Sequence, residues 1–278
     1  MTHPPCIQVE NLHYTYGDEV PALRGIDLTI ADNDFVAIIG QNGSGKTTLV
    51  KHFNGLLKPT RGRVLIDGVD TAHRSVSELA HTVGYVFQNP DYQLFCATTW
   101  EELSFGPRNL GLDEAEVRAQ TEEALTYFGL QAFAEAPPAI LGYGLRRLVS
   151  VAAVYTLRPR IFVLDEPTAG LDWRATLGLM ALVGRLHEVG HTILLVTHDM
   201  RLVAGFCRRS LVLHEGRVLL DGPTRQVFGQ ADLLQQAQIE LPQVCVLARQ
   251  LSSQGIPGDC LTVGDLAGSL ARRLGERP

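Results

Sequence analysis

A glycine-rich loop directly after a short apolar run is the feature that most constrains this chain. Residues 35–39 are apolar throughout, and residues 40–48 read Gly-Gln-Asn-Gly-Ser-Gly-Lys-Thr-Thr. Glycines let backbone N–H groups face a phosphate, and a helix that starts in the loop adds the positive end of its dipole. The pattern therefore predicts a buried strand, a phosphate-binding turn and a helix from about Lys46.

The loop predicts an ATP site with Mg²⁺ as its second cofactor. We expect Lys46 to reach the β- and γ-phosphates, and the hydroxyl of Thr47 to bind Mg²⁺. The ATP-binding residues predicted within this segment are Gly40, Asn42, Gly43, Ser44, Gly45, Lys46, Thr47 and Thr48.

Two acidic residues at the end of a second apolar run predict the other half of the site. Residues 161–164 are apolar and lead into Asp165 and Glu166. We expect Asp165 to reach the Mg²⁺ shell and Glu166 to lie beside the γ-phosphate, where it polarises water. Two acids after a strand are weak evidence alone, but the glycine loop upstream makes them strong.

Strands that alternate with helices predict an α/β fold with a parallel sheet and right-handed crossovers. Residues 192–196, Thr-Ile-Leu-Leu-Val, predict another buried strand, and a hairpin is expected around Glu215-Gly216. Asp113 and Glu116 are spaced as a capping box that opens a helix to about Phe128.

The two ends of the chain differ from this centre. Residues 7–30 alternate apolar and polar positions, which predicts antiparallel strands with turns at residues 16–18 and at Arg24-Gly25. From about residue 226 the chain consists of short amphipathic pieces broken by Pro242 and Pro257. We expect a small helical tail that is an interaction surface or, alternatively, a packing appendage.

Charge and composition narrow the class of protein. The formal net charge is −6 and no basic stripe is evident, so nucleic acid is not an expected partner. The five cysteines are scattered without a Cys-x-x-Cys motif, which favours a reducing cytosol. The longest apolar stretch, residues 148–157, is far below the roughly 20 residues that span a bilayer. We expect a soluble protein that acts at a membrane through partners.

The string Asp165-Glu-Pro-Thr-Ala-Gly-Leu-Asp172, followed by Thr197-His198-Asp199, resembles the ABC-type ATPases. The resemblance covers nearly all of residues 7–223. It implies that His198 contacts the γ-phosphate, that Asp172 lies in the loop facing an opposite subunit, and that Tyr16 stacks on adenine. It also implies that Gln88 begins a sensor loop and is a ligand of Mg²⁺. Gln88, Glu166 and His198 would be the catalytic residues.

The same resemblance implies a division of the chain. Residues 1–223 would form a P-loop ABC nucleotide-binding domain, with a mixed parallel sheet, an antiparallel β subdomain and a helical subdomain at about 89–158. Residues 224–278 would form a small C-terminal helical domain that helps to hold two ATPases together.

A more specific resemblance lies in residues 86–111 and in the tail. Val86-Phe-Gln-Asn-Pro-Asp-Tyr-Gln-Leu-Phe95, the motif at 98–107 and the segments at 222–228 and 241–249 resemble the ATPases of energy-coupling factor (ECF) importers, including their cobalt and nickel branch. It implies a place at the cytoplasmic face of the cell membrane. It also implies contact with a transmembrane coupling subunit through Asp91, Tyr92, Gln93, Leu94 and Phe95.

The chain departs from the family at the signature motif. Where Leu-Ser-Gly-Gly-Gln is expected, residues 141–145 read Leu-Gly-Tyr-Gly-Leu. Gly142 lacks the serine hydroxyl, Tyr143 places a ring where a close approach is needed, and Leu145 replaces the glutamine, while Gly144 is kept. Each lost charge-assisted hydrogen bond costs roughly 1.5–3 kcal/mol, and each lost transition-state donor slows catalysis about 10²–10³-fold.

The resemblance implies the motor subunit of an ECF-type importer for a vitamin or a transition-metal micronutrient. The altered motif favours an asymmetric heterodimer with a second ATPase whose signature is intact. The resemblance also implies a separate substrate-binding membrane subunit. The alternatives are a homodimeric cobalt or nickel importer ATPase, and a non-transport ABC ATPase acting on DNA or ribosomes. The histidines are dispersed and do not identify a cargo.

Overall fold

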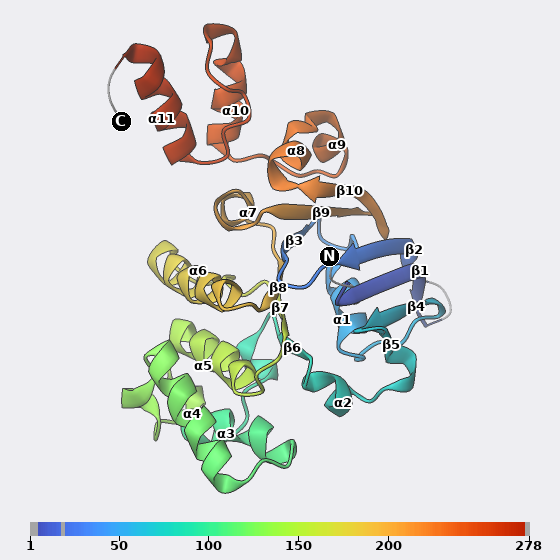
Figure 1. Ribbon diagram of the computed structural model, residues 1–278, viewed down its shortest axis with the longest axis vertical. Helices are drawn as coiled ribbons and strands as arrows, with labels where there is room; N and C mark the ends of the chain where they lie inside the picture. Colours follow the sequence, from blue (N-terminus) through green and yellow to red (C-terminus); the bar gives the residue numbers. More distant parts are fainter. Residues whose placement is uncertain (1–4, 18–19, 276–278) are drawn as a thin grey trace.

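The apolar runs of the sequence form the centre of a six-stranded sheet in the computed structural model, which describes residues 5–17 and 20–275 (Figure 1). The strand order is β10-β9-β3-β8-β7-β6. All neighbours pair in parallel except β9 and β10, which form the predicted antiparallel hairpin. The strands are β3 (Phe35–Ile39), β6 (Val83–Val86), β7 (Ile161–Asp165), β8 (Thr192–Val196), β9 (Arg209–His214) and β10 (Arg217–Pro223).

A second sheet of four antiparallel strands has the order β2-β1-β4-β5. Its strands are β1 (Ile7–Tyr16), β2 (Val20–Ile30), β4 (Arg61–Ile66) and β5 (Val69–Asp70). The antiparallel sheet was predicted, but the turn at Arg24-Gly25 is wrong. Arg24 pairs with His13 and Ile26 with Leu12, so Gly25, at φ 79°, is the extra residue of a bulge inside β2.

Parts of some predictions lie outside the described residues. These are Asp18 in the first expected turn and the ends of the two expected domains, residues 1–4 and 276–278.

Helices cover both faces of the central sheet. The predicted helix from Lys46 and the capping box at Asp113 are both confirmed. The helices are α1 (Lys46–Phe53), α2 (Val76–Ala80), α3 (Thr99–Asn109), α4 (Glu114–Phe128), α5 (Tyr143–Tyr155), α6 (Trp173–Glu188), α7 (Met200–Phe206), α8 (Thr224–Gly229), α9 (Ala231–Gln236), α10 (Gln243–Gln250) and α11 (Val263–Leu274). Among residues 5–17 and 20–275, no helix is both long and apolar enough to cross a bilayer.

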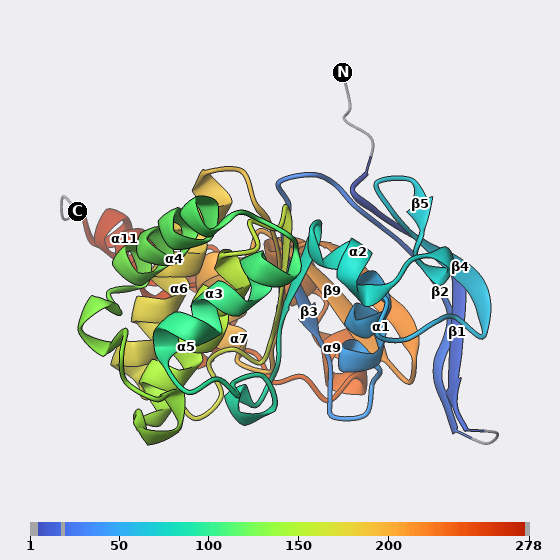
Figure 2. The same cartoon turned by 90° about the horizontal axis from the view of Figure 1, so that it is seen from below.

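The buried side chains divide into three clusters. One fills the space between the central sheet and helices α3–α6, and another lies between the two sheets and α1. Figure 2 shows these four helices on one side of the central sheet, and α1 with the antiparallel sheet on the other. The first cluster also takes in Val227, Phe228 and Leu234 of α8 and α9. Helices α10 and α11 have a small core of their own around Ala248, Ile256 and Leu266.

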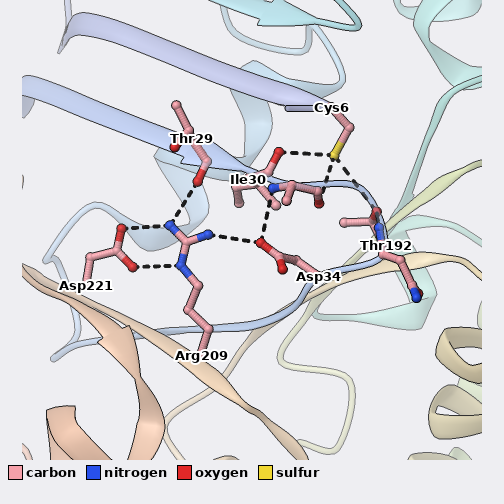
Figure 3. A network of polar contacts seen from close by, with 9 residues as sticks. Cys6, Thr29, Ile30, Asp34, Thr192, Arg209 and Asp221 are labelled. Atoms are coloured by element: carbon pink, nitrogen blue, oxygen red, sulfur yellow. Dashed lines mark hydrogen bonds and ion pairs between the residues drawn. The ribbon is translucent and has the colours of Figure 1, made fainter. Parts of the chain in front are cut away.

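Arg209 at the start of β9 ties the antiparallel sheet to the central sheet (Figure 3). Its guanidinium makes a bidentate ion pair with Asp221 of β10, with both N–O distances 2.8 Å. It also donates to Asp34 Oδ2 at 3.0 Å and to the backbone oxygen of Thr29 at 2.8 Å. Asp34 in turn accepts from the N–H of Ala31. The connection from β2 to β3 is therefore fixed to β9 and β10.

We expect Arg209→Ala to lower the free energy of unfolding by about 2 kcal/mol, because two partly buried carboxylates lose their cation. Denaturant titration of the full chain measures this change. The control is Arg63→Ala, which removes an ion pair between two half-exposed side chains and should leave the unfolding midpoint nearly unchanged. Equal midpoints for the two variants would contradict the structural role of Arg209.

Candidate functional site

A cavity of about 330 Å³ opens where the glycine loop meets the ends of the central strands. The structure brings most of the predicted nucleotide residues together in its wall. They are Tyr16, Asn42, Gly43, Gly45, Lys46, Thr47, Thr48, Gln88, Asp165 and Glu166. Gly40 and Ser44 shape the loop from behind: a Cβ on Gly40 would lie 2.3 Å from the backbone oxygen of Leu213 and 2.6 Å from Ser44 Oγ.

The loop is built to hold phosphate. Gly45, at φ 103°, is the N-cap of α1 and contributes no capping side chain, so the first N–H groups of the helix are left for a ligand. Lys46 is 8% exposed, and its Nζ donates to the backbone oxygens of Gly40 at 2.8 Å and Gln41 at 2.9 Å. Burial lowers the pKa of Lys46, while Glu166 and Asp165 oppose that shift. A triphosphate fits this loop, because its negative charge would balance the positive charge of the buried Lys46 ammonium group, which here contacts neutral carbonyls.

Asp165 lies at the bottom of the cavity, 2% exposed. Thr47 Oγ1 donates to its two carboxylate oxygens at 3.2 and 3.0 Å, and the hydroxyl of Tyr85 donates to Oδ2 at 2.8 Å. Gln88 lines the same cavity. A hydroxyl, a carboxylate and an amide are the oxygen ligands that Mg²⁺ prefers, so the donor set fits the ion.

Glu166 follows Asp165 but adopts a left-handed backbone, with φ 48°. Such a conformation is strained for a residue other than glycine and is typical of functional sites. Its carboxylate is nearly buried and lies 2.8 Å from Nδ1 of His198, whose side chain is largely exposed. Burial raises the pKa of Glu166, and His198 opposes this shift. A carboxylate with a raised pKa is a stronger proton acceptor.

Tyr16 lines the cavity and is 43% exposed as a residue. Its hydroxyl lies 3.2 Å from Thr48 Oγ1, and its ring contacts Tyr14 edge to face. A held, half-exposed aromatic ring is suited to stacking on a flat base.

The predicted signature residues lie at the start of α5 instead of in the cavity wall. Gly142 is exposed and caps the helix without a side-chain hydrogen bond. Leu145 is half-buried and packs against the cluster between the central sheet and helices α3–α6. Tyr143 is turned toward its own chain, against Gly170. Asp172 caps α6 by accepting from the N–H of Ala175 at 2.8 Å.

The five residues predicted to contact a membrane subunit divide into two groups. Tyr92 and Phe95 are exposed by 82% and 66%. Asp91 forms an ion pair with Arg146 at 2.6 Å, and Leu94 packs against the cluster between the central sheet and helices α3–α6. Gln93 accepts from the N–H of Phe87 and donates to the backbone oxygen of Ser150 at 2.7 Å. Asp91, Gln93 and Leu94 thus fix the segment to the rest of the chain, while Tyr92 and Phe95 are exposed.

Sequence reasoning missed three polar residues that hold these loops. Tyr85 orients Asp165, and the buried carboxylate of Glu102 accepts from the N–H groups of Phe95 and Cys96 at 2.9 and 2.8 Å. The third is Arg147, which is fully buried. A polar residue within an otherwise apolar segment is the signal that marks Tyr85; Glu102 and Arg147 lie in ordinary helical patterns.

Comparison with known proteins identifies the class. The ABC transporter family profile matches residues 23–169, and the chain belongs to this family. It is the ATPase of an ABC transporter and is of the energy-coupling factor type. It is 38% identical to the energy-coupling factor transporter ATP-binding protein EcfA2 of Caldanaerobacter subterraneus, over 96% of this chain and 97% of that protein. It also spans 43% of a longer relative from the same organism, with 42% identity.

Solved structures agree with this assignment. The chain resembles cbiO1 of Clostridium perfringens, described as part of the ABC transporter complex cbiONQ, with a TM-score of 0.75 and 37% identity over 87% of this chain and 98% of that one. It also resembles the ATP-binding cassette MJ0796, solved as a dimer bound to ADP and phosphate, with a TM-score of 0.71 and 30% identity over 78% and 98% of the two chains.

We expect Tyr85→Phe to raise the Mg²⁺ concentration needed for half-maximal ATP binding about tenfold, because Asp165 loses the donor that orients it. Titration of nucleotide binding with Mg²⁺ measures this change. The matched control is Tyr127→Phe, whose hydroxyl donates to the backbone oxygen of Leu182 at 3.0 Å among the helices. An unaltered Mg²⁺ requirement in Tyr85→Phe would show that Tyr85 does not position the metal ligand.

Proposed function

We propose that this chain is the ATP-hydrolysing motor subunit of an ECF-type importer for a vitamin or a transition-metal micronutrient. The observation that carries the proposal is the convergence of Lys46, Thr47, Asp165 and Glu166 on one cavity. Similarity to an ECF ATP-binding protein over nearly the whole of both chains supports the importer class. ATP binding closes two ATPases on each other, hydrolysis reopens them, and the motion reaches a membrane subunit.

The residues in and beside the cavity have different roles in ATP binding and hydrolysis. Lys46 exchanges its bonds with the loop carbonyls for the β- and γ-phosphates, and Tyr16 stacks on the adenine. Glu166 accepts a proton from the attacking water, and His198 holds Glu166 and contacts the γ-phosphate. Thr47, Gln88 and Asp165 would hold Mg²⁺, and the bound ion would supply positive charge against the phosphates.

The exposed rings of Tyr92 and Phe95 support a contact with a transmembrane coupling subunit at the cytoplasmic face of the membrane. The segment Asp91–Phe95 begins three positions after Gln88 and is anchored to α5 through Gln93 and Asp91. It would therefore move with the helices when the nucleotide changes. Residues 224–278 are proposed as the domain that helps to hold the two ATPases together, and a separate membrane subunit selects the cargo.

The altered signature supports an asymmetric pair. Gly142 is exposed at the N-terminus of α5 and has no hydroxyl to offer a nucleotide held by a partner. The cavity of this chain, by contrast, keeps both acids, and His198 lies against Glu166. We therefore infer a heterodimer in which a partner's intact signature completes this chain's site, and this chain's Gly142 and Leu145 leave the partner's nucleotide in a weak site. The alternative is a homodimer with two weak sites.

Affinity purification of the tagged chain from gently solubilised membranes, followed by mass spectrometry, tests the importer role. We expect a second ATPase with an intact Leu-Ser-Gly-Gly-Gln motif and hydrophobic subunits. Recovery of this chain alone, or with soluble partners alone, would contradict the proposal.

We expect Gly142→Ser combined with Leu145→Gln to raise ATP turnover of the assembled complex at least about twofold, because a second site gains its missing donors. A serine fits at 142, since an added Cβ there meets nothing within 4 Å. Gly178→Ser on α6, where a Cβ is equally free, is the control. Unchanged turnover would show that the donors missing at Gly142 and Leu145 are not limiting, and normal turnover by this chain alone would contradict the heterodimer.

A further inference from the structure

Tyr143 contacts a loop of the nucleotide site through its ring. A Cβ added to Gly170 would lie 2.9 Å from Cε1 and 3.4 Å from Cζ of Tyr143, so the ring rests on the backbone of Gly170. Gly170, at φ 78°, belongs to the loop that runs from Glu166 to Asp172. The ring therefore occupies the space beside this loop that a side chain at 170 would need.

The hydroxyl of Tyr143 contacts a second loop through Arg147, one helical turn further along α5. Arg147 is fully buried, and its Nη2 donates to the hydroxyl of Tyr143 at 3.0 Å. The same guanidinium donates to the backbone oxygen of Phe87 at 2.7 Å and to that of Gln88. The three acceptors are neutral oxygens. A buried cation held by neutral acceptors depends on each of them, because its desolvation is costly.

Tyr143 therefore stands between two loops that carry predicted catalytic residues. The ring borders the loop that begins with Glu166, and the hydroxyl helps to orient the guanidinium that holds the carbonyls of Phe87 and Gln88. Gln93 adds a separate connection between the Gln88 loop and α5, through Phe87 and Ser150.

We propose that Tyr143 is a positioning residue that holds the Gln88 loop and the 166–172 loop in register with α5 within a single chain. The tyrosine thus differs from Gly142 and Leu145, which only remove donors from the signature. It acts through Arg147 and Gly170 and does not touch the nucleotide. Its effect on turnover rests on the proposed roles of Gln88 and Glu166, whereas its effect on loop order does not.

The test compares two substitutions by hydrogen exchange of the full chain, read by mass spectrometry. Tyr143→Phe removes the hydroxyl and keeps the ring. We expect exchange of residues 87–95 to become about tenfold faster, the effect of one hydrogen bond to a charged group, with residues 166–172 unchanged. Tyr143→Gly removes the ring as well, and both segments should exchange faster.

Turnover of the assembled complex supplies the second readout. We expect Tyr143→Phe to lower kcat for ATP several-fold at an unchanged KM, because the glycine loop and Lys46 are untouched. Tyr155→Phe is the matched control: it removes a phenol hydroxyl from the same helix, where it donates to Glu123 at 2.7 Å. It should change neither the exchange of residues 87–95 nor kcat.

Three results would overturn the proposal. They are unchanged exchange of residues 87–95 in Tyr143→Phe, slower exchange of these residues in that variant, or an equal effect of Tyr155→Phe on this exchange. Faster exchange with an unchanged kcat would contradict the proposed roles of Gln88 and Glu166 instead. The exchange measurement needs no membrane partner. A failure of the importer role in the purification experiment would therefore leave the loop measurement interpretable, and the two failures are distinguishable.

Discussion

The nucleotide site depends on one buried carboxylate, that of Asp165. It accepts hydrogen bonds from Thr47 at the start of α1 and from Tyr85 in β6, and it ends β7 itself. One group therefore joins the glycine loop to two neighbouring parallel strands. The carboxyl ends of such strands meet at one edge of a sheet, where ligands of α/β proteins bind. Glu166 and the cavity owe their positions to this junction.

The centre of the fold could be predicted because its signals are local. Strands β3, β7 and β8 are buried on both faces, so each contains at least four consecutive apolar residues. The capping box at Asp113 fixes the start of α4. The turn at Arg24-Gly25 was wrong because a glycine at positive φ serves a bulge as well as a turn, and only the pairing with β1 distinguishes them.

The site shows the same division between local motifs and long-range contacts. The glycine loop is one contiguous motif and Asp165-Glu166 is another, and the structure gathers the two in one cavity. Tyr85 and Arg147 were missed because their partners are set by tertiary packing. Glu102 was missed although its partners lie only six and seven positions earlier, because it occupies an ordinary helical position. Arg147 shows this most clearly: its acceptors at Phe87 and Gln88 lie about sixty positions away, and no local pattern marks an arginine that is to be buried.

This chain's own cavity is the working site of the proposed asymmetric pair. Turnover of the assembled complex carrying Glu166→Gln tests this most directly. We predict that turnover falls about 10²-fold or more while ATP still binds, since only the general base is lost. The same change at the corresponding glutamate of the partner should leave most of the turnover. A complex that keeps half or more of its rate with Glu166→Gln would contradict the account.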